Sequence, residues 1–540
     1  MKPQATTSEI ESAVPEARHW GLTVAINTLN PFLAQVFTKV LILGYLIVQY
    51  RLIGGGAGKL ADYFLAGIVL MYTGTISDWG LSTLLTREVA KEGEGARAAQ
   101  LFRETLALRL IISLGLFLPV SLFVLIYLAW FGLSAEGAWV TLLLTLSLLP
   151  GAFSGSVTAL LYARERMSPP AVVSIATSLL NVALGVGALL LGWGIIGLAL
   201  AALISTLVTA LAFARILRRD FPEIDLRTPQ VQGSRFKANQ VDGNHVSRFT
   251  FQPLALLKSG WPLMLNALLV GLFFRADQFI IKANQGDLGV ERYQAAYSFL
   301  NFVLLITPAV TLALFPRMAR HAENDRTRLA YEYTFALKML LLLSVPLMAL
   351  TIWFAPLLIT IVTGARPEFL SSSAVALQIL ILFLPLSFIN GVTQYVLIAL
   401  NRQHLITWAF GATVLFNLAA NLVLVPLLGI NGAAIATIGS ELVLVAPFIY
   451  WTAKEIGRVR MEQLAWKPIL VGVIMALLTW QLWPFMERWR ESVSDFAVYI
   501  ALGMLIGALS IVTLALLKPL TQQELAGLRS ALNRRTRAKE

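Results

Sequence analysis

The sequence predicts an all-α polytopic membrane protein with about fourteen transmembrane helices. Three observations support this fold class. Apolar residues make up 57% of the 540 residues, whereas charged residues make up only 13%. The mean hydropathy is +0.73, far above the usual mixture for soluble domains. Apolar runs of about 20 residues, the length with which a helix crosses roughly 30 Å of hydrocarbon, recur along the whole chain.

The predicted helices follow one another from residue 23 to residue 517. Their spans are 23–50, 63–84, 105–130, 138–161, 170–192, 195–214, 259–281, 293–316, 334–360, 372–400, 405–427, 431–452, 466–484 and 496–517. The 22 residues before them are polar and contain three glutamates, so they lack the basic and then apolar order of a cleavable signal peptide. We therefore expect the first helix itself to direct membrane insertion.

Lysine and arginine are distributed unevenly between the two sides of the membrane. With the N-terminus placed in the cytoplasm, 31 of the 42 basic residues lie in cytoplasmic segments, 7 in the opposite loops and 4 within helices. The positive-inside rule then predicts a protein of the cytoplasmic (inner) membrane with both termini in the cytoplasm. The net charge of +12 is explained by attraction to the anionic inner leaflet, so membrane lipids and no nucleic acid are the expected partners.

An internal repeat divides the chain into two halves. The run "TLALRLIISL" (105–114) resembles "TFALKMLLLL" (334–343), and "GIIGLALAALIS" (194–205) resembles "GINGAAIATIGS" (429–440). Further matches follow in the same order at offsets between 229 and 236. Because each repeat contains six helices, an even number, the two halves should have the same orientation, with a substrate cleft between them.

The repeat predicts two parallel six-helix lobes followed by two C-terminal helices. The expected divisions are a cytoplasmic N-terminal segment 1–22, an N-lobe 23–214, a polar cytoplasmic linker 215–258, a C-lobe 259–452, the last two helices in 453–517 and a basic cytoplasmic tail 518–540.

A lysine stands inside the apolar run "NPFLAQVFTKVLIL" (30–43). At an offset of 236, Lys39 corresponds to Arg275, so both halves place a cation near the middle of their first helix. Each unpaired charge there costs at least about 2.5 to 3.5 kcal/mol on insertion scales. Two interpretations are open: structural ion pairs, with Asp277 or Glu441 as partner, or a water-filled cavity whose cations bind an anionic substrate.

Other polar residues in the predicted helices are secondary candidates. Arg109 and Lys338 are repeat-equivalent near the cytoplasmic ends of their helices, where they can extend to the interface or admit an anionic headgroup. Asp78 can cap or pair locally, or take part in ion coupling. Side-chain amides could line the cleft or hydrogen-bond between helices; they are Asn30, Asn266, Asn301, Asn390, Gln394, Asn417 and Asn421.

The sequence carries no recognisable enzyme signature. The run "GGGAGK" (54–59) resembles a phosphate-binding loop, but Ile53 replaces the required glycine and Leu60 replaces the hydroxyl residue. The four histidines are scattered without metal-ligand spacing, and the chain has no cysteine. We therefore expect a transporter without a resident cofactor or metal.

Four motifs resemble a known family. These are "ISDWGLSTLLTREVAK" (76–91), "LFPRMAR" (314–320), "FAPLLITIVTG" (354–364) and "GINGAAIAT" (429–437). They are similar to the polysaccharide flippases of the O-antigen repeat-unit type, within the multidrug, oligosaccharidyl-lipid and polysaccharide exporter superfamily. The resemblance implies two lobes that alternate between inward-open and outward-open states around a cationic cavity, while the isoprenyl tail of the substrate runs in lipid.

The resemblance also implies a substrate and partners. The substrate would be an anionic, polyprenyl diphosphate-linked oligosaccharide held by Lys39 and Arg275, with glycosyltransferases and a polymerase of the same pathway as partners. A coupling cation, Na⁺ or H⁺, would bind at Asp277 or Glu441. The rival functions are a multidrug-type ion-coupled antiporter on the same fold, whose cavity should present carboxylates, and a membrane polysaccharide polymerase or glycosyltransferase, which usually carries a larger external loop.

Overall fold

The structure is a computed structural model that describes residues 33–53, 58–92, 96–131, 134–222, 224, 253–307, 318–322, 325–364, 366–457, 461–482 and 492–517. All regular structure in these ranges is helical, which confirms the predicted all-α class. After a first helix over Leu33–Leu52, the elements are α2 (Ala61–Asp78), α3 (Leu81–Glu92), α4 (Ala96–Gly115), α5 (Phe117–Phe131), α6 (Ala135–Leu146), α7 (Leu148–Ala163), α8 (Ser168–Leu190), α9 (Gly194–Asp220), α10 (Pro253–Arg275), α11 (Asp277–Val303), α13 (Arg326–Thr363), α14 (Pro367–Leu380), the 3-10 turn η1 (Ile381–Phe383), α15 (Leu384–Ala399), α16 (Gln403–Leu428), α17 (Ile430–Ile456), α18 (Met461–Gln481) and α20 (Val493–Leu516).

Twelve helical segments of the described residues are long and apolar enough to cross a membrane. The difference from the fourteen predicted helices has two sources. Helices α10 and α11 form one candidate span of 51 residues, and the apolar part of α18 over Trp466–Met475 is shorter than a full span. The protein is therefore a multi-pass membrane protein of the predicted class.

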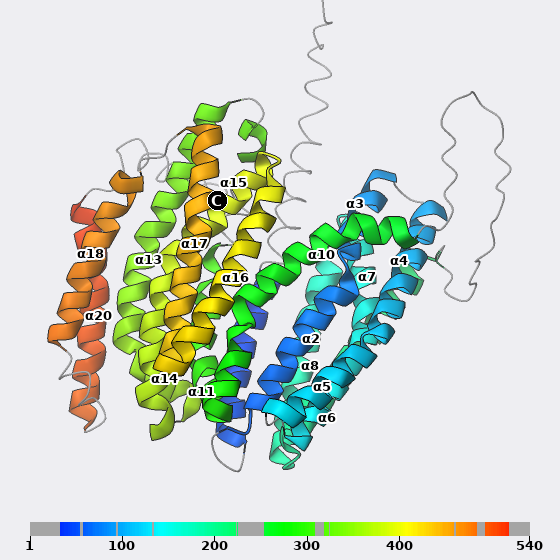
Figure 1. Ribbon diagram of the computed structural model, residues 1–540, viewed down its shortest axis with the longest axis horizontal. Helices are drawn as coiled ribbons and strands as arrows, with labels where there is room; N and C mark the ends of the chain where they lie inside the picture. The colour runs from blue at the N-terminus through cyan, green and yellow to red at the C-terminus, as the bar shows by residue number, and fades with distance from the viewer. Residues whose placement is uncertain are drawn as a thin grey trace, which may run out of the picture. The chain divides into compact units, whose positions relative to one another are not determined.

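The described chain divides into two compact units, Met1–Glu291 and Arg292–Glu540. In the first unit, α2 packs on α6, α3 on α4 and α7, and α8 on α9; the blue and cyan ribbons of Figure 1 show several of these helices. Buried apolar side chains such as Phe102, Val157 and Leu160 form the core between α4 and α7. Helix α10 also packs on α2 and α3 and belongs to this unit.

Helices α2 and α3 are separated by a two-residue break. Trp79 and Gly80 both have positive φ, 49° and 73°, and Trp79 ends α2 in the left-handed conformation. The break lies against α10, because the Trp79 indole nitrogen donates to Leu257 O at 3.0 Å. A Cβ built on Gly260 would lie 2.2 Å from Trp79 O, so only glycine allows the two backbones to approach this closely.

In the second unit, α16 and α17 lie side by side (Figure 1) and α13 packs on α14 and α15. The C-terminal helices α18 and α20 pack on α13. Trp353 and Tyr499 fix this contact reciprocally: the indole donates to Tyr499 O at 3.0 Å and the phenol donates to Trp353 O at 2.7 Å. Helices α18 and α20 thus pack on α13 after the six-helix repeat has ended.

The internal repeat has a structural counterpart. Gly194 begins α9 and Gly429 precedes α17, and both have positive φ, 57° and 63°. Three residues later, Gly197 and Gly432 approach the preceding helix, with a built Cβ only 2.8 Å from Ala188 Cβ and 2.1 Å from Leu424 O. The α8–α9 and α16–α17 pairs therefore use the same turn chemistry.

The predicted domain limits stay predictions, but three facts bear on them. Helix α9 continues to Asp220 and α10 begins at Pro253, so both helices enter the predicted linker 215–258. The first unit extends to Glu291, beyond the predicted start of the C-lobe. The segments 1–22, 225–252 and 518–540 lie outside the described residues, as does the last part of the predicted helix 293–316, from residue 308 onward.

Candidate functional site

Lys39 and Arg275 lie near each other within the first unit. Lys39 stands in the helix Leu33–Leu52 and is half-buried, and Arg275 is the last residue of α10. The two side chains are close enough for electrostatic repulsion. The structure therefore brings together the two cations that the repeat paired across the halves.

Asp277 and Tyr72 complete this group, which we call the cation cluster: Lys39, Tyr72, Arg275 and Asp277. Asp277 is 2% exposed, and the Tyr72 hydroxyl on α2 lies within electrostatic range of both Asp277 and Arg275. That hydroxyl is buried without a hydrogen-bond partner among the described residues. Buried polar atoms normally have a partner, so the Tyr72 hydroxyl can donate to a ligand.

The predicted helix 259–281 is broken at Ala276. Arg275 ends α10 and Asp277 begins α11, so the positive side chain stands at a helix C-terminus and the carboxylate at a helix N-terminus. Each charge there is favoured by the helix dipole. Arg275 and Asp277 therefore belong to two successive helices.

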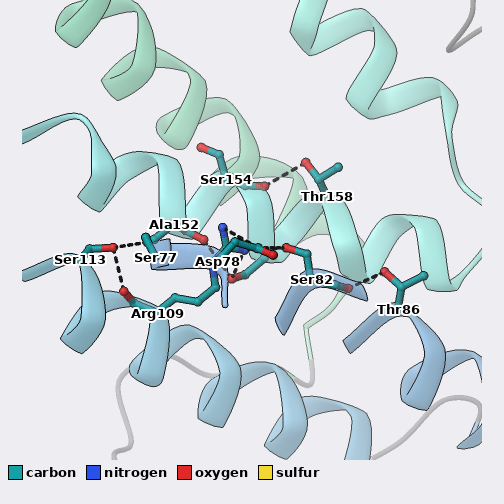
Figure 2. Close-up of polar contacts among 10 residues, drawn as sticks. Ser77, Asp78, Ser82, Thr86, Arg109, Ser113, Ala152, Ser154 and Thr158 are labelled. Carbon is teal, nitrogen blue, oxygen red and sulfur yellow. Dashed lines mark hydrogen bonds and ion pairs between the residues drawn. The ribbon is translucent and has the colours of Figure 1, made fainter. Parts of the chain in front are cut away.

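Arg109 and Asp78 form an ion pair inside the first unit (Figure 2). The guanidinium nitrogen Nη2 lies 3.2 Å from Asp78 Oδ1, and the Arg109 side chain is 8% exposed. Nη1 donates to Ser82 Oγ at 2.8 Å and to Ser156 Oγ at 3.3 Å. The expectation that Arg109 extends to the cytoplasmic interface is therefore wrong, because α3 and α7 supply partners inside the bundle.

Two further contacts hold this ion pair in place. Ser82 Oγ donates to Asp78 Oδ1 at 2.5 Å, which links the carboxylate across the break between α2 and α3. A Cβ on Gly155 would lie 2.8 Å from Arg109 Nη2, so glycine leaves the space that the guanidinium fills. Lys338, the repeat-equivalent residue, is half-buried on α13 in the second unit.

The remaining predicted site residues are not members of the cation cluster. In the second unit, Asn390 Nδ2 donates to Glu441 Oε2, and Glu441 is 2% exposed. Asn417 Nδ2 donates to Ser440 Oγ at 2.9 Å. Asn266, Asn301 and Gln394 are half-buried, on α10, α11 and α15. Asn30 lies outside the described residues.

Sequence reasoning missed a buried charge network at the other end of α2. Lys282 Nζ lies 3.0 Å from Asp62 Oδ1 and also contacts Asp287, and the Lys282 side chain is 3% exposed. Asp62 also accepts from Ser134 N at 3.1 Å. Lys282 belongs to the part of α11 that precedes its kink at Gly286. A lone aspartate at the start of an apolar helix is the signal that indicates such a partner.

Glu291 fixes the turn before α2. Its carboxylate accepts from the backbone N–H groups of Gly58, at 2.8 Å, and Leu60. Tyr50 donates to the Glu291 carbonyl at 2.7 Å. These contacts are structural, because they satisfy backbone donors.

Comparison with models of known protein families identifies the family of this chain. Residues 24–322, more than half of the chain, match the family described as polysaccharide biosynthesis protein. The chain belongs to this family. Residues 262–442 also match the MatE family. No curated protein sequence matches the chain.

Solved structures of transporters share the fold. The lipid II flippase MurJ in an inward closed conformation is 15% identical, with a TM-score of 0.69, over 89% of this chain and 97% of that one. An inward-facing multidrug resistance MATE family transporter of the MOP superfamily is 18% identical, with a TM-score of 0.55, over 77% and 94%. A MOP superfamily transporter from Pyrococcus furiosus is 18% identical, with a TM-score of 0.56, over 80% and 95%. These structures, each under 25% identical, show that the chain shares the fold of these transporters.

Proposed function

We propose that this transporter is a flippase that moves a polyprenyl diphosphate-linked oligosaccharide from the inner to the outer leaflet of the cytoplasmic membrane, by alternating access, for polysaccharide export. The observation that carries the proposal is the cation cluster. Two cations and one carboxylate lie together within candidate membrane helices, where charged groups usually mark a substrate pathway.

The chemistry of the cluster suits a diphosphate. Arg275 can bind two phosphate oxygens in bidentate fashion, and Lys39 supplies a compact point charge. The Tyr72 hydroxyl, which lacks a partner among the described residues, can donate a further hydrogen bond. Outward transfer of about two negative charges across about 100 mV, negative inside, is downhill by roughly 4 to 5 kcal/mol if they cross the full field.

Resetting the empty carrier would use a coupling cation, Na⁺ or H⁺. Asp277 in the first unit and Glu441 in the second are the candidate binding groups, since both carboxylates are 2% exposed. Glycosyltransferases and a polymerase of the same pathway would supply and consume the lipid-linked glycan at the two membrane faces.

Transport in vesicles tests the proposal. Purified protein in proteoliposomes with a polyprenyl diphosphate-linked oligosaccharide is expected to move glycan across the membrane over time, as measured by cleavage with an impermeant glycosidase. Protein-free liposomes and the Lys39→Ala/Arg275→Ala double variant should show only the slow background rate. Equal rates in all three preparations would contradict the proposal.

A multidrug-type antiporter is the second candidate, favoured by the MatE match over residues 262–442. Organic cations bind best where carboxylates are in excess. The cation cluster has the opposite balance among its named groups, so an anionic substrate is the better fit. Stimulated efflux of cationic dyes from cells that express the protein would support the antiporter instead.

Topology is tested with cysteines placed in this cysteine-free chain. Cysteine at position 56 or 194 is expected to react with an impermeant thiol reagent in intact cells, because the charge asymmetry places these glycines outside. Cysteine at Gly95 or Gln240 should react only after the membrane is opened. The reverse labelling pattern would overturn the proposed cytoplasmic location of both termini.

A further inference from the structure

A cavity lies in the first unit, between α2, α3 and α10. Its volume is about 390 Å³, and its walls are mostly apolar, with Leu70, Leu263 and Met264 among the lining residues. Three polar residues, Thr75, Asp78 and Thr83, also face it. The size falls within the range of small-molecule sites, and none of these residues belongs to the cation cluster.

The polar groups of this cavity can form further hydrogen bonds with a ligand. Among the described residues, Ser82 and Arg109 both contact Oδ1 of Asp78, so Oδ2 can accept from a ligand. The Asp78 side chain is 30% exposed. Thr83 is exposed, and no hydrogen bond of its hydroxyl is found in the described part of the chain. Thr75 donates to Met71 O at 2.9 Å, so its oxygen can still accept.

The charge of the cavity wall is balanced. Arg109 lies 3.2 Å from Asp78, so the carboxylate is already compensated and the wall is polar but close to neutral. Such a wall offers little attraction to a free cation or anion. It favours a neutral group that carries several hydroxyls, because hydroxyls both donate and accept.

The cavity and the cation cluster share two helices at a fixed spacing. On α2, Asp78 is six residues from Tyr72, which corresponds to about 9 Å along the helix axis. On α10, the lining residue Ala267 is eight residues from Arg275, or about 12 Å. The two helices pack closely between these points, since a Cβ on Gly271 would lie 3.4 Å from both Met71 and Tyr72. One diphosphate with its first sugar rings can bridge this spacing.

We propose that the α2–α3–α10 cavity binds neutral sugar rings of the substrate, next to a diphosphate held by the cation cluster. Asp78 accepts a sugar hydroxyl, Thr83 donates to or accepts from another, and the apolar wall contacts the ring carbons. This inference rests on the proposed function and adds a recognition site for the glycan. The ion pair with Arg109 has the role of orienting Asp78 in this site.

Two probes of equal charge distinguish binding at the cation cluster from binding in the α2–α3–α10 cavity. The methyl probe is farnesyl diphosphate with a methyl group on its terminal phosphate. The glucosyl probe is farnesyl diphosphate with one glucose on its terminal phosphate. Binding of both to the purified full-length protein is measured by titration calorimetry. Ala267→Phe, which fills the cavity, is expected to lower the affinity for the glucosyl probe to that for the methyl probe. Ala176→Phe, at an exposed position of α8, is the matched control and should change neither affinity.

A second variant removes one hydroxyl and little volume. Thr83→Val is expected to weaken binding of the glucosyl probe by about 2- to 10-fold, the effect of one lost hydrogen bond, and to leave the methyl probe unaffected. Thr83→Ser should restore most of the loss. Lys39→Ala should lower the affinity for both probes to the same extent.

The possible failures are distinct. If Ala267→Phe and Thr83→Val leave the affinity for the glucosyl probe unchanged, or lower the affinity for both probes equally, the proposed sugar site is contradicted. Binding of the diphosphate would then still support the proposed function. If the unmodified protein binds neither probe, the proposed function fails and the sugar site with it.

Discussion

Alanine in place of Lys39 or Arg275 is expected to abolish most glycan export while the protein still inserts and accumulates normally. Each substitution removes charge-assisted contacts to the diphosphate, which predicts a loss of about 10- to 100-fold in transport rate. The rate is measured with the vesicle assay, and protein abundance with immunoblots of membranes. Lys258→Ala, which removes an exposed lysine from α10, is the matched control and should transport normally.

Charge-preserving variants of the same residues separate binding from structure. Lys39→Arg should keep much activity because a point charge suffices there, whereas Arg275→Lys should lose more because lysine cannot make the bidentate contact. If the cations serve only structural pairing, each alanine variant would instead lower abundance, and neutralising a carboxylate, with Asp277→Asn or Glu441→Gln, would restore it. Normal export by the double alanine variant would end the diphosphate hypothesis.

The second large effect concerns stability. Asp78→Ala removes the only carboxylate found within ion-pair distance of Arg109 in the described residues and leaves a guanidinium that is 8% exposed. An uncompensated buried charge destabilises a protein by about 3 to 5 kcal/mol. We therefore expect a lower Tm, measured as loss of monodisperse protein in detergent after heating.

Neutralising the partner should reverse much of this loss. The double variant Asp78→Ala/Arg109→Met removes both charges and keeps an apolar side chain in the space beside Gly155, so its Tm should approach that of the unmodified protein. Glu88→Ala breaks an ion pair with Arg87, whose side chain is 60% exposed, and should change Tm little because exposed pairs contribute about 0 to 1 kcal/mol. A Tm for Asp78→Ala equal to that of Glu88→Ala would contradict the assignment.

The fold was largely predictable because membrane helices leave a strong sequence signal. Hydrocarbon requires long apolar runs with internally satisfied backbones, and the glycine turns at Gly194 and Gly429 recur at the repeat offset. The break at Ala276 was not predictable, since alanine has the highest helix propensity of all residues. The helix α10 was assigned to the second half because sequence order does not reveal which unit a helix packs against.

The candidate site was predictable only in part. Lys39 and Arg275 stand out because a charge inside an apolar run is costly, but the repeat did not predict that both residues lie in the first unit. Arg109 was misread because its partners Ser82 and Ser156 are 27 and 47 residues away. The Asp62–Lys282 pair spans 220 residues. Such contacts depend on tertiary packing, which a single sequence does not show.

The placement of α10 and Glu291 in the first unit determines where the protein can be divided for separate expression. A fragment that ends in the predicted linker would lose α10, and the break at Trp79 and Gly80 would lose the backbone against which it packs. The N–H groups of Gly58 and Leu60 would also lose the Glu291 carboxylate, at a cost typical of unsatisfied buried donors. A first fragment that reconstitutes with its complement should therefore extend through Glu291.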